Sequence, residues 1–334
     1  MPSSDADETT QPKQRVTTVV LAGLAVCFVV LRLFSRKVKH VSLGSDDWTL
    51  IVGLIFVLVV AGINLACIEY GMGLHTSTLD PTQMPIFFKL IYAFEPLYIT
   101  TVGIIKISVL LMYHRIFPVR MIKIAGSILA TITIAWVISV DLVAIFQCNP
   151  IRKGYEPTIP GSCINLKGAL VGNGVPNFVT DIIILALPAR LIWRLQASTS
   201  QRLSIILVFL SGSFVVFASI YRFSLIFVFD PNDIAWTLAD AQTWCVVETA
   251  AGVISACLPT IIPLIKACTK GLASTARSLS RTNPTQSASQ GNGDVTTGSG
   301  GNFTLGELSS GNRASHLSNK AKGWTVIQTD VDGK

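Results

Sequence analysis

The sequence predicts an all-α membrane protein, a seven-transmembrane helix bundle with its N-terminus outside and its C-terminus in the cytoplasm. Three observations predict this fold class. Half of the 334 residues are hydrophobic and only 13% are charged, against about a quarter charged in soluble domains. Seven apolar stretches are each long enough to cross a bilayer, which takes about 20 residues. Lys and Arg gather on alternate loops between these stretches, as the positive-inside rule requires of a multi-pass protein.

The seven predicted spans differ in strength. The fifth is the weakest, because Gly168, Gly172, Gly174 and Pro176 crowd its first half. Its second half, 178–187, is strongly apolar, and lipid demands that every backbone hydrogen bond be satisfied within the helix. The predicted spans are residues 16–34, 48–68, 86–112, 124–146, 168–188, 203–228 and 239–265.

Orientation follows from the basic residues of the loops. Residues 32–39, 115–123, 190–202 and 266–281 contain fourteen Lys and Arg. The opposite side has five, which are Lys13, Arg15, Arg152, Lys153 and Lys167, and its loops 69–85 and 229–238 contain none. The basic loops are expected in the cytoplasm, and the plasma membrane is the expected location. Although the net charge is +7, its division among short loops leaves no continuous basic stripe, so nucleic-acid binding is not expected.

The chain divides into three predicted regions. Residues 1–15 are a polar extracellular N-terminus, and 16–268 form the membrane domain. Residues 269–334 are rich in Ser, Gly, Asn and Thr and bury too little apolar surface to fold alone, so a disordered cytoplasmic tail is predicted.

Ionisable residues inside the spans are the first candidates for a functional site, because each costs at least about 2.5 kcal/mol at mid-helix and needs a partner or a task. Depth along the spans places Glu95, Asp141, Arg222 and Glu248 in an outer layer. One guanidinium cannot neutralise three carboxylates, so at least one acid is left to be protonated, hydrated or matched to a cationic group. Together with Trp244 these are the candidate ligand-binding residues. The alternative is that Arg222 and Glu248 only tie two helices together.

A second, inner layer is expected toward the cytoplasm. Its members are Asp46, Asp47, Lys106, Arg115 and Asp181, with Lys106 facing Asp181 or Asp47. Such ion pairs can hold a bundle in two states or simply lock its assembly, and both interpretations stay open. Asp46 and Asp47 also precede an apolar run, where they can cap the second span and pair with Lys106 or Arg36.

Cys148 and Cys163 share one polar loop that is predicted to face the oxidising exterior, which favours a disulfide bond. Closing a loop of that size stabilises by about 3 kcal/mol in the chain-entropy model. The closed loop is expected to lie as a lid over the outer cavity.

Several short motifs follow one another in a distinctive order. They are Arg32, LGSDDW at 43–48, YGMGLH at 70–75, KIS at 106–108, YHRIF at 113–117, CNP at 148–150, Cys163-Ile164-Asn165, Thr180-Asp181, Arg222, Glu248 and CLP at 257–259. Over residues 16–268 this order resembles the fungal rhodopsin-like integral membrane proteins. The resemblance implies a seven-helix, rhodopsin-like architecture. It does not imply retinal, because a Schiff-base lysine must lie midway along the seventh span and Lys266 lies at its cytoplasmic end. No cofactor is expected.

No enzyme is predicted, since no span contains a histidine and neither a Ser-His-Asp order nor a phosphate-binding glycine loop is present. The expected function is a receptor-like protein that senses a small extracellular ligand through the outer cavity. Its expected partners are the lipid bilayer, that ligand, and a G protein or another cytoplasmic protein, the G protein by analogy alone. The alternative is a transporter or accessory membrane protein associated with secondary metabolism, as the resemblance implies.

Overall fold

A computed structural model describes residues 9–280 except 118, 157, 193–198, 229 and 231–232, and leaves out the side chains of 166–167, 189–192, 199–205, 208 and 263–280. Within these residues, seven helices are long and apolar enough to cross a membrane, so the predicted seven-helix bundle is confirmed. The helices are α1 Gln11–Val38, α2 Ser45–Glu69, α3 Met84–Ile116, α4 Arg120–Ile145, α5 Leu166–Ile192, α6 Thr199–Val228 and α7 Ile234–Ser280.

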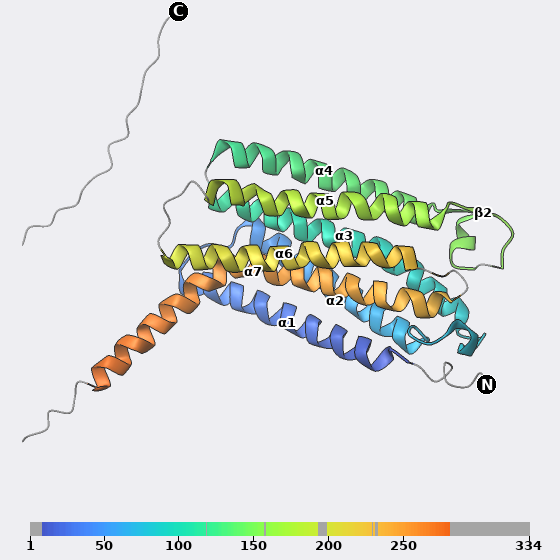
Figure 1. The fold of residues 1–334 in the computed structure, drawn as a ribbon, viewed down its shortest axis with the longest axis horizontal. Helices are drawn as coiled ribbons and strands as arrows, with labels where there is room; N and C mark the ends of the chain where they lie inside the picture. Colours follow the sequence, from blue (N-terminus) through green and yellow to red (C-terminus); the bar gives the residue numbers. More distant parts are fainter. Residues whose placement is uncertain are drawn as a thin grey trace, which may run out of the picture. The chain divides into compact units, whose positions relative to one another are not determined.

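The helix ends differ from the predicted ends because the backbone ladder continues where apolar side chains stop. α1 begins at Gln11, inside the predicted polar N-terminus, and α7 continues to Ser280, past the predicted domain boundary at residue 268. The last part of α7 extends away from the other helices (Figure 1). The rest of the predicted tail, 281–334, lies outside the described residues.

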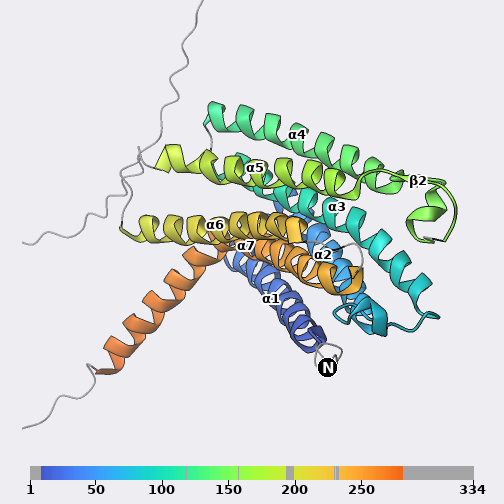
Figure 2. The same ribbon diagram turned by 45° about the vertical axis from the view of Figure 1, so that its right-hand side comes forward.

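The helices form a closed ring in chain order. Each packs on the next, α7 packs back on α1, and α3 and α7 also meet inside the ring. Figures 1 and 2 show the helices lying side by side along the bundle. In their apolar windows 61% of α3 and 67% of α7 is buried, against 17% of α4. α3 and α7 are therefore the central helices, and α4 turns apolar side chains such as Ile128, Ile132 and Ile138 outward, where lipid would cover them.

One end of the bundle, here called the hairpin end, carries the loops before α3, α5 and α7. A two-stranded antiparallel hairpin of β1 Cys148–Asn149 and β2 Ser162–Cys163 lies there, at the same end as the start of α1 (Figure 1). Cys148 and Cys163 are joined, which confirms the predicted disulfide. The loop between the strands contains the short helix η2 Ile151–Gly154.

Backbone hydrogen bonds tie three segments together at the hairpin end. Gly73, in the loop before the short helix η1 Thr76–Thr78, accepts from the Thr10 N–H at 3.2 Å and donates to the Ala235 carbonyl at 3.0 Å. Its φ of +86° lies in the left-handed region that glycine adopts without strain. This turn joins the start of α1 to the start of α7. The opposite end, which carries the α1–α2 and α3–α4 loops, is called the basic end.

Candidate functional site

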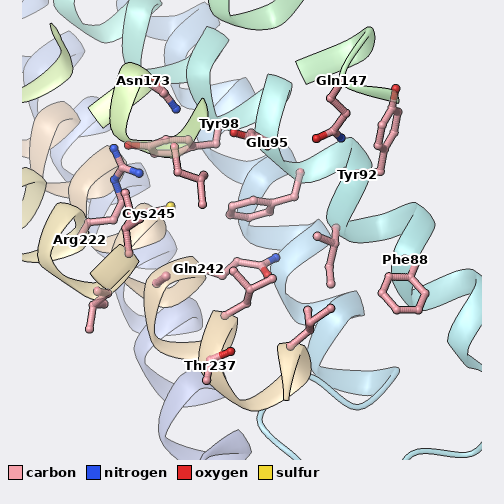
Figure 3. Close-up of a pocket in the computed structure, with 18 of the residues that line it drawn as sticks. Phe88, Tyr92, Glu95, Tyr98, Gln147, Asn173, Arg222, Thr237, Gln242 and Cys245 are labelled. Carbon is pink, nitrogen blue, oxygen red and sulfur yellow. The ribbon is translucent and has the colours of Figure 1, made fainter. Parts of the chain in front are cut away.

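A cavity of about 320 Å³ opens at the hairpin end. α3, α6 and α7 build most of its wall, and the hairpin loop contributes Gln147 and Gly154. Aromatic and aliphatic side chains dominate, with a few polar groups among them (Figure 3). Its aromatic and polar side chains include Phe88, Tyr92, Phe94, Glu95, Tyr98, Asn173 and Arg222. This composition, mostly apolar with few polar groups, is typical of small-molecule sites.

Glu95 is the acidic side chain of this cavity wall. It lies within electrostatic reach of Arg222 and Asp141, but forms no hydrogen bond or ion pair with any residue that the structure describes. Asn173, 4% exposed, also lines the cavity, and its Oδ1 has no hydrogen-bond partner among the described residues. Two acceptors of the cavity wall are thus left without a donor.

Glu248 lies on α7, 2% exposed, and its carboxylate gathers four donors from three other helices. Oε2 accepts from Arg222 Nε at 3.1 Å and from the Tyr98 hydroxyl at 2.8 Å. Oε1 accepts from Asn177 Nδ2 and Ser219 Oγ, both at 2.7 Å. Even when Asp181 takes the Ser219 proton, three donors serve this buried carboxylate, as a charge in a membrane span requires.

Lys106 on α3 extends the same network to a second carboxylate. Its ammonium pairs with Asp181 on α5 at 3.0 Å and donates to the side chains of Asn177 and Thr180 at 2.8 Å. It also lies 5.3 Å from the ring centre of Trp136 on α4. Ser219 Oγ lies within hydrogen-bond distance of both Asp181, at 2.9 Å, and Glu248.

The result is a continuous buried layer that crosses the bundle, here called the polar network. Its members are Tyr98, Lys106, Asn177, Thr180, Asp181, Ser219, Arg222 and Glu248. Tyr98 and Arg222 line the hairpin-end cavity. Lys106, Asp181 and Glu248 line a second hollow of about 70 Å³. The polar network therefore separates two hollows and joins α3, α5, α6 and α7.

A separate charge cluster lies at the basic end. Asp46 accepts from Arg32 at 2.6 Å, Arg36 at 3.0 Å and Arg115 at 2.9 Å. Asp47 pairs with Arg32 at 2.8 Å and caps α2 by accepting the Gly44 N–H at 3.1 Å. The predicted capping and the predicted Arg36 pairing are both present.

Arg32 is the functional candidate that charge counting missed, because it was counted only as a basic loop residue. It is 1% exposed and also donates to the Ala256 carbonyl of α7 at 2.5 Å. The available signal was its spacing from Arg36, since residues four apart share one helix face and can meet the adjacent acids together.

The structure divides both predicted layers. Of the five candidate ligand residues, Glu95 and Arg222 line the cavity, and Glu248 lies behind Arg222. Asp141 instead accepts from Thr100 at 2.9 Å between α4 and α3, and Trp244 packs on Tyr221 with ring centres 4.5 Å apart.

The five expected inner residues likewise do not form one lock. Lys106 pairs with Asp181, not with Asp47, and both belong to the polar network. Asp46, Asp47 and Arg115 belong to the basic-end cluster. Depth along the spans could not reveal this division, because it depends on how each helix is rotated.

A third polar contact closes the hairpin end beside the cavity, and is called the loop latch. His75 Nδ1 lies 2.5 Å from Asp233 Oδ2, and the Thr76 N–H and hydroxyl donate to Asp233 Oδ1 at 2.8 and 2.9 Å. The His75 ring stacks on Trp236 with centres 4.4 Å apart. Partial burial acts to raise the pKa of Asp233, but the Thr76 and His75 hydrogen bonds outweigh it and hold that pKa below its usual value of 3.8.

The chemistry of the described residues gives no sign of a metal centre. No group of three or more His, Cys, Asp and Glu residues in the described part of the chain could hold a metal ion. The side chain of Lys266, on which the expectation about retinal rests, lies outside the described residues, so that expectation stays a prediction.

Comparison with known proteins gives matches that extend over most of this chain. The fungal rhodopsin domain matches residues 31–267. The chain is 29% identical over 278 residues, 78% of its length and 75% of the other's, to Polyenoic acids biosynthesis gene cluster protein Ba17b of Metarhizium anisopliae. It is 31% identical over 233 residues to the SAT4 family membrane protein of Emericella nidulans (69% and 59% of the two chains). Receptor GIN3 of Arthrobotrys oligospora is 24% identical over 247 residues, 72% of this chain and 59% of that one.

Proposed function

Because this chain belongs to the fungal rhodopsin domain family of multi-pass membrane proteins, we propose that it is a receptor-like protein that binds a small ligand in the hairpin-end cavity. One observation carries the proposal. The cavity ends on the polar network, which joins four helices. A ligand that touches Arg222 or Tyr98 therefore acts on side chains that position α3, α5, α6 and α7 relative to one another. The similarity to a protein named as a receptor supports the same proposal.

The proposed orientation places the hairpin end outside the cell and the basic end in the cytoplasm, with the plasma membrane as the location. The disulfide supports it, because such bonds persist in oxidising surroundings. In this orientation the ligand arrives from outside, and the Arg32 cluster at the basic end faces a G protein or another cytoplasmic partner. The role is non-enzymatic and needs no retinal.

A screen on the purified protein tests the proposal. The chain is reconstituted in lipid nanodiscs, and its thermal unfolding is followed with small neutral, anionic, cationic and zwitterionic compounds. A true ligand raises the unfolding midpoint, because binding to the folded state alone stabilises it by mass action. Ala241→Phe fills the cavity that Ala241 lines and is expected to abolish that rise. Ala135→Phe, on the outward face of α4, is the matched control.

Compounds that stabilise both variants equally, or a screen in which none stabilises the wild type, would contradict the proposal.

A second candidate function is transport or an accessory role in secondary metabolism. Proteins similar to this chain are named for biosynthesis clusters of polyenoic acids and wortmanamides, which favours a transporter or accessory protein of secondary metabolism. The double variant Lys106→Met/Asp181→Asn, which leaves no unpaired charge, separates the two when both ligand response and substrate flux are measured. Loss of flux with an unchanged response would favour transport.

A further inference from the structure

The charges around the cavity do not balance, and the imbalance points to the chemistry of the ligand. Arg222 is paired with Glu248 at 3.1 Å, and Lys106 with Asp181 at 3.0 Å. Each buried cation of the polar network thus has its own carboxylate. Glu95 is left over, because it pairs with none of the described residues. When Glu95 is ionised, the cavity therefore presents one negative charge more than the polar network can neutralise.

We propose that the cavity binds an organic cation, an ammonium group on a compact apolar body, with Glu95 as its counter-ion. The proposal rests on the proposed function and adds the chemical class of the ligand. A carboxylate in a mostly apolar cavity lacks the hydration it has in bulk water, and this loss is costly unless a cation or donor replaces the water. An ammonium group supplies both charge and N–H donors.

Asn173 adds an observation that does not depend on charge. Its Oδ1 is buried and without a partner among the described residues, although buried polar atoms are nearly always hydrogen-bonded. Asn173 and Glu95 line the same cavity (Figure 3). Both present acceptors, and a primary ammonium group carries more than one N–H with which to satisfy them.

The aromatic wall suits the same ligand. Phe88, Tyr92, Phe94 and Tyr98 all come from α3 and line the cavity beside Glu95. Aromatic ring faces attract cations within about 6 Å. The protein already uses this attraction here, because the Arg222 guanidinium lies 5.0 Å from the ring centre of Tyr98. The remaining rings offer contact for an apolar body.

An anionic ligand is the competing chemistry, since Arg222 also lines the cavity. Arg222 is already neutralised by Glu248, and an anion beside it would stand in the field of the unpaired Glu95. The volume of about 320 Å³ lies at the lower end of small-molecule pockets, about 300–1,000 Å³. This size favours a compact body over a long-chain lipid.

The test uses three probes of one shape and three charges: phenylpropylammonium, phenylpropanol and phenylpropanoate. Each is titrated into the full chain in phosphatidylcholine nanodiscs, whose lipid carries no net charge, and the Kd is measured by calorimetry. The ammonium probe is expected to bind at least about tenfold more tightly than the other two. Glu95→Gln, which keeps the side-chain volume, is expected to raise the Kd of the ammonium probe at least about tenfold and to leave the Kd of the alcohol unchanged. The reason is that a buried charge pair loses much of its affinity when one partner is removed.

The control variant is Glu69→Gln, which removes an acid that pairs with Arg15 at the surface, outside the cavity. It should bind all three probes as the wild type does. Tightest binding of phenylpropanoate, equal binding of the three probes, or an ammonium affinity unchanged in Glu95→Gln would each overturn the inference and leave the proposed function standing. If no probe binds at millimolar concentration, the cation inference is wrong. The proposed function falls only if the Ala241→Phe screen fails as well.

Discussion

Asp181 is a buried carboxylate whose cationic partner, Lys106, comes from a different helix. Both side chains are less than a tenth exposed. Removing one member of such a pair is far more harmful than removing both, because an uncompensated buried charge remains. A single substitution at Lys106 or Asp181 is therefore predicted to be more harmful than the double substitution.

We expect Lys106→Met to destabilise the protein by about 3–5 kcal/mol, measured by SDS-induced unfolding in mixed micelles. Adding Asp181→Asn should recover most of that loss, since the double variant has no unpaired charge. Lys37→Met, at an exposed position of α1, is the matched control and should change little. Equal stability of the Lys106→Met and Lys37→Met variants would show that Lys106 does not neutralise Asp181.

The loop latch makes a prediction about pH. The pKa of Asp233 is lowered in the folded state, so its stabilising effect is present above the unfolded value of about 3.8 and is lost as the pH falls through the folded value. Asp233→Asn is expected to lower the free energy of unfolding at pH 7, and with it the thermal midpoint. The loss is under about 1 kcal/mol because the pair is partly exposed.

Below pH 3.8 the difference between wild type and Asp233→Asn should shrink toward zero. Asp80→Asn is the comparison variant. Asp80 lies in the same loop and Thr82 also lowers its pKa, but its carboxylate is fully exposed, so its difference should have the same sign and be smaller. A difference that stays constant from pH 7 to pH 3 would mean that the Asp233 carboxylate is not the stabilising group. Thermal unfolding across this range measures both variants.

Single site residues were partly predictable. Glu95 and Arg222 could be found because any charge in a span stands out against an apolar background. Asn173, Asn177, Ser219 and Tyr98 could not, because neutral polar side chains occur in spans for many reasons and only their contacts give them a role. Trp244 packs on Tyr221 and is not among the residues that line the cavity, since helix rotation decides which way an aromatic side chain points.

At the scale of helices, α3 and α4 approach closely at Gly103. A Cβ added there would overlap Val137 of α4, and Val137 cannot yield easily because β-branched side chains are stiff at χ1. The close approach is available only to glycine, and it brings Lys106, one turn further along α3, beside Trp136.

Gly103→Ala is therefore expected to destabilise the bundle by about 1–3 kcal/mol, the usual cost of overpacking. Gly62→Ala in α2 is the control, because nothing lies within 4 Å of the added Cβ and alanine is the better helix former by up to about 1 kcal/mol. SDS unfolding of the two variants should move in opposite directions. A neutral Gly103→Ala would indicate that α4 is free to shift.

The helices themselves were largely predictable, because twenty apolar residues have few alternatives in a bilayer. Their ends were not. α2 begins at Ser45 because Asp47 caps it, and α7 runs on to Ser280 through Lys and Ser residues that hydropathy assigned to a tail. Polar residues can extend a helix beyond the bilayer, and an apolar window does not register them.

For the whole molecule, the central expectation is that its two ends face opposite sides of the membrane. Arg152→Cys lies in the hairpin loop and Lys37→Cys near the end of α1 at the basic end, both exposed. In intact cells a membrane-impermeant maleimide is expected to label Arg152→Cys only, and both after permeabilisation. The unmodified chain gives the background from its free cysteines. The reverse pattern would invert the proposed orientation and remove the extracellular ligand.

The grouping of the buried charges could not be predicted from the sequence. Sorting charges by depth predicted two layers, and the structure has a mid-bundle network and a separate basic-end cluster. Lys106 could have met Asp47 or Asp181 on depth alone. Lys106 pairs with Asp181 because α3 packs against α5. Asp46 and Asp47 of α2 instead pair with Arg32 on α1.

The polar network also has a consequence for membrane insertion, because the helices enter the bilayer one after another during synthesis. Lys106 enters the bilayer with α3, but Asp181 arrives only with α5, and Glu248 comes last with α7. A nascent chain halted after α4 holds an unmatched ammonium, at a cost of at least about 2.5 kcal/mol. We therefore expect α3 of the wild type to crosslink to the insertion machinery until α5 has been synthesised. In Lys106→Met, which has no charge to neutralise, α3 should leave that machinery earlier.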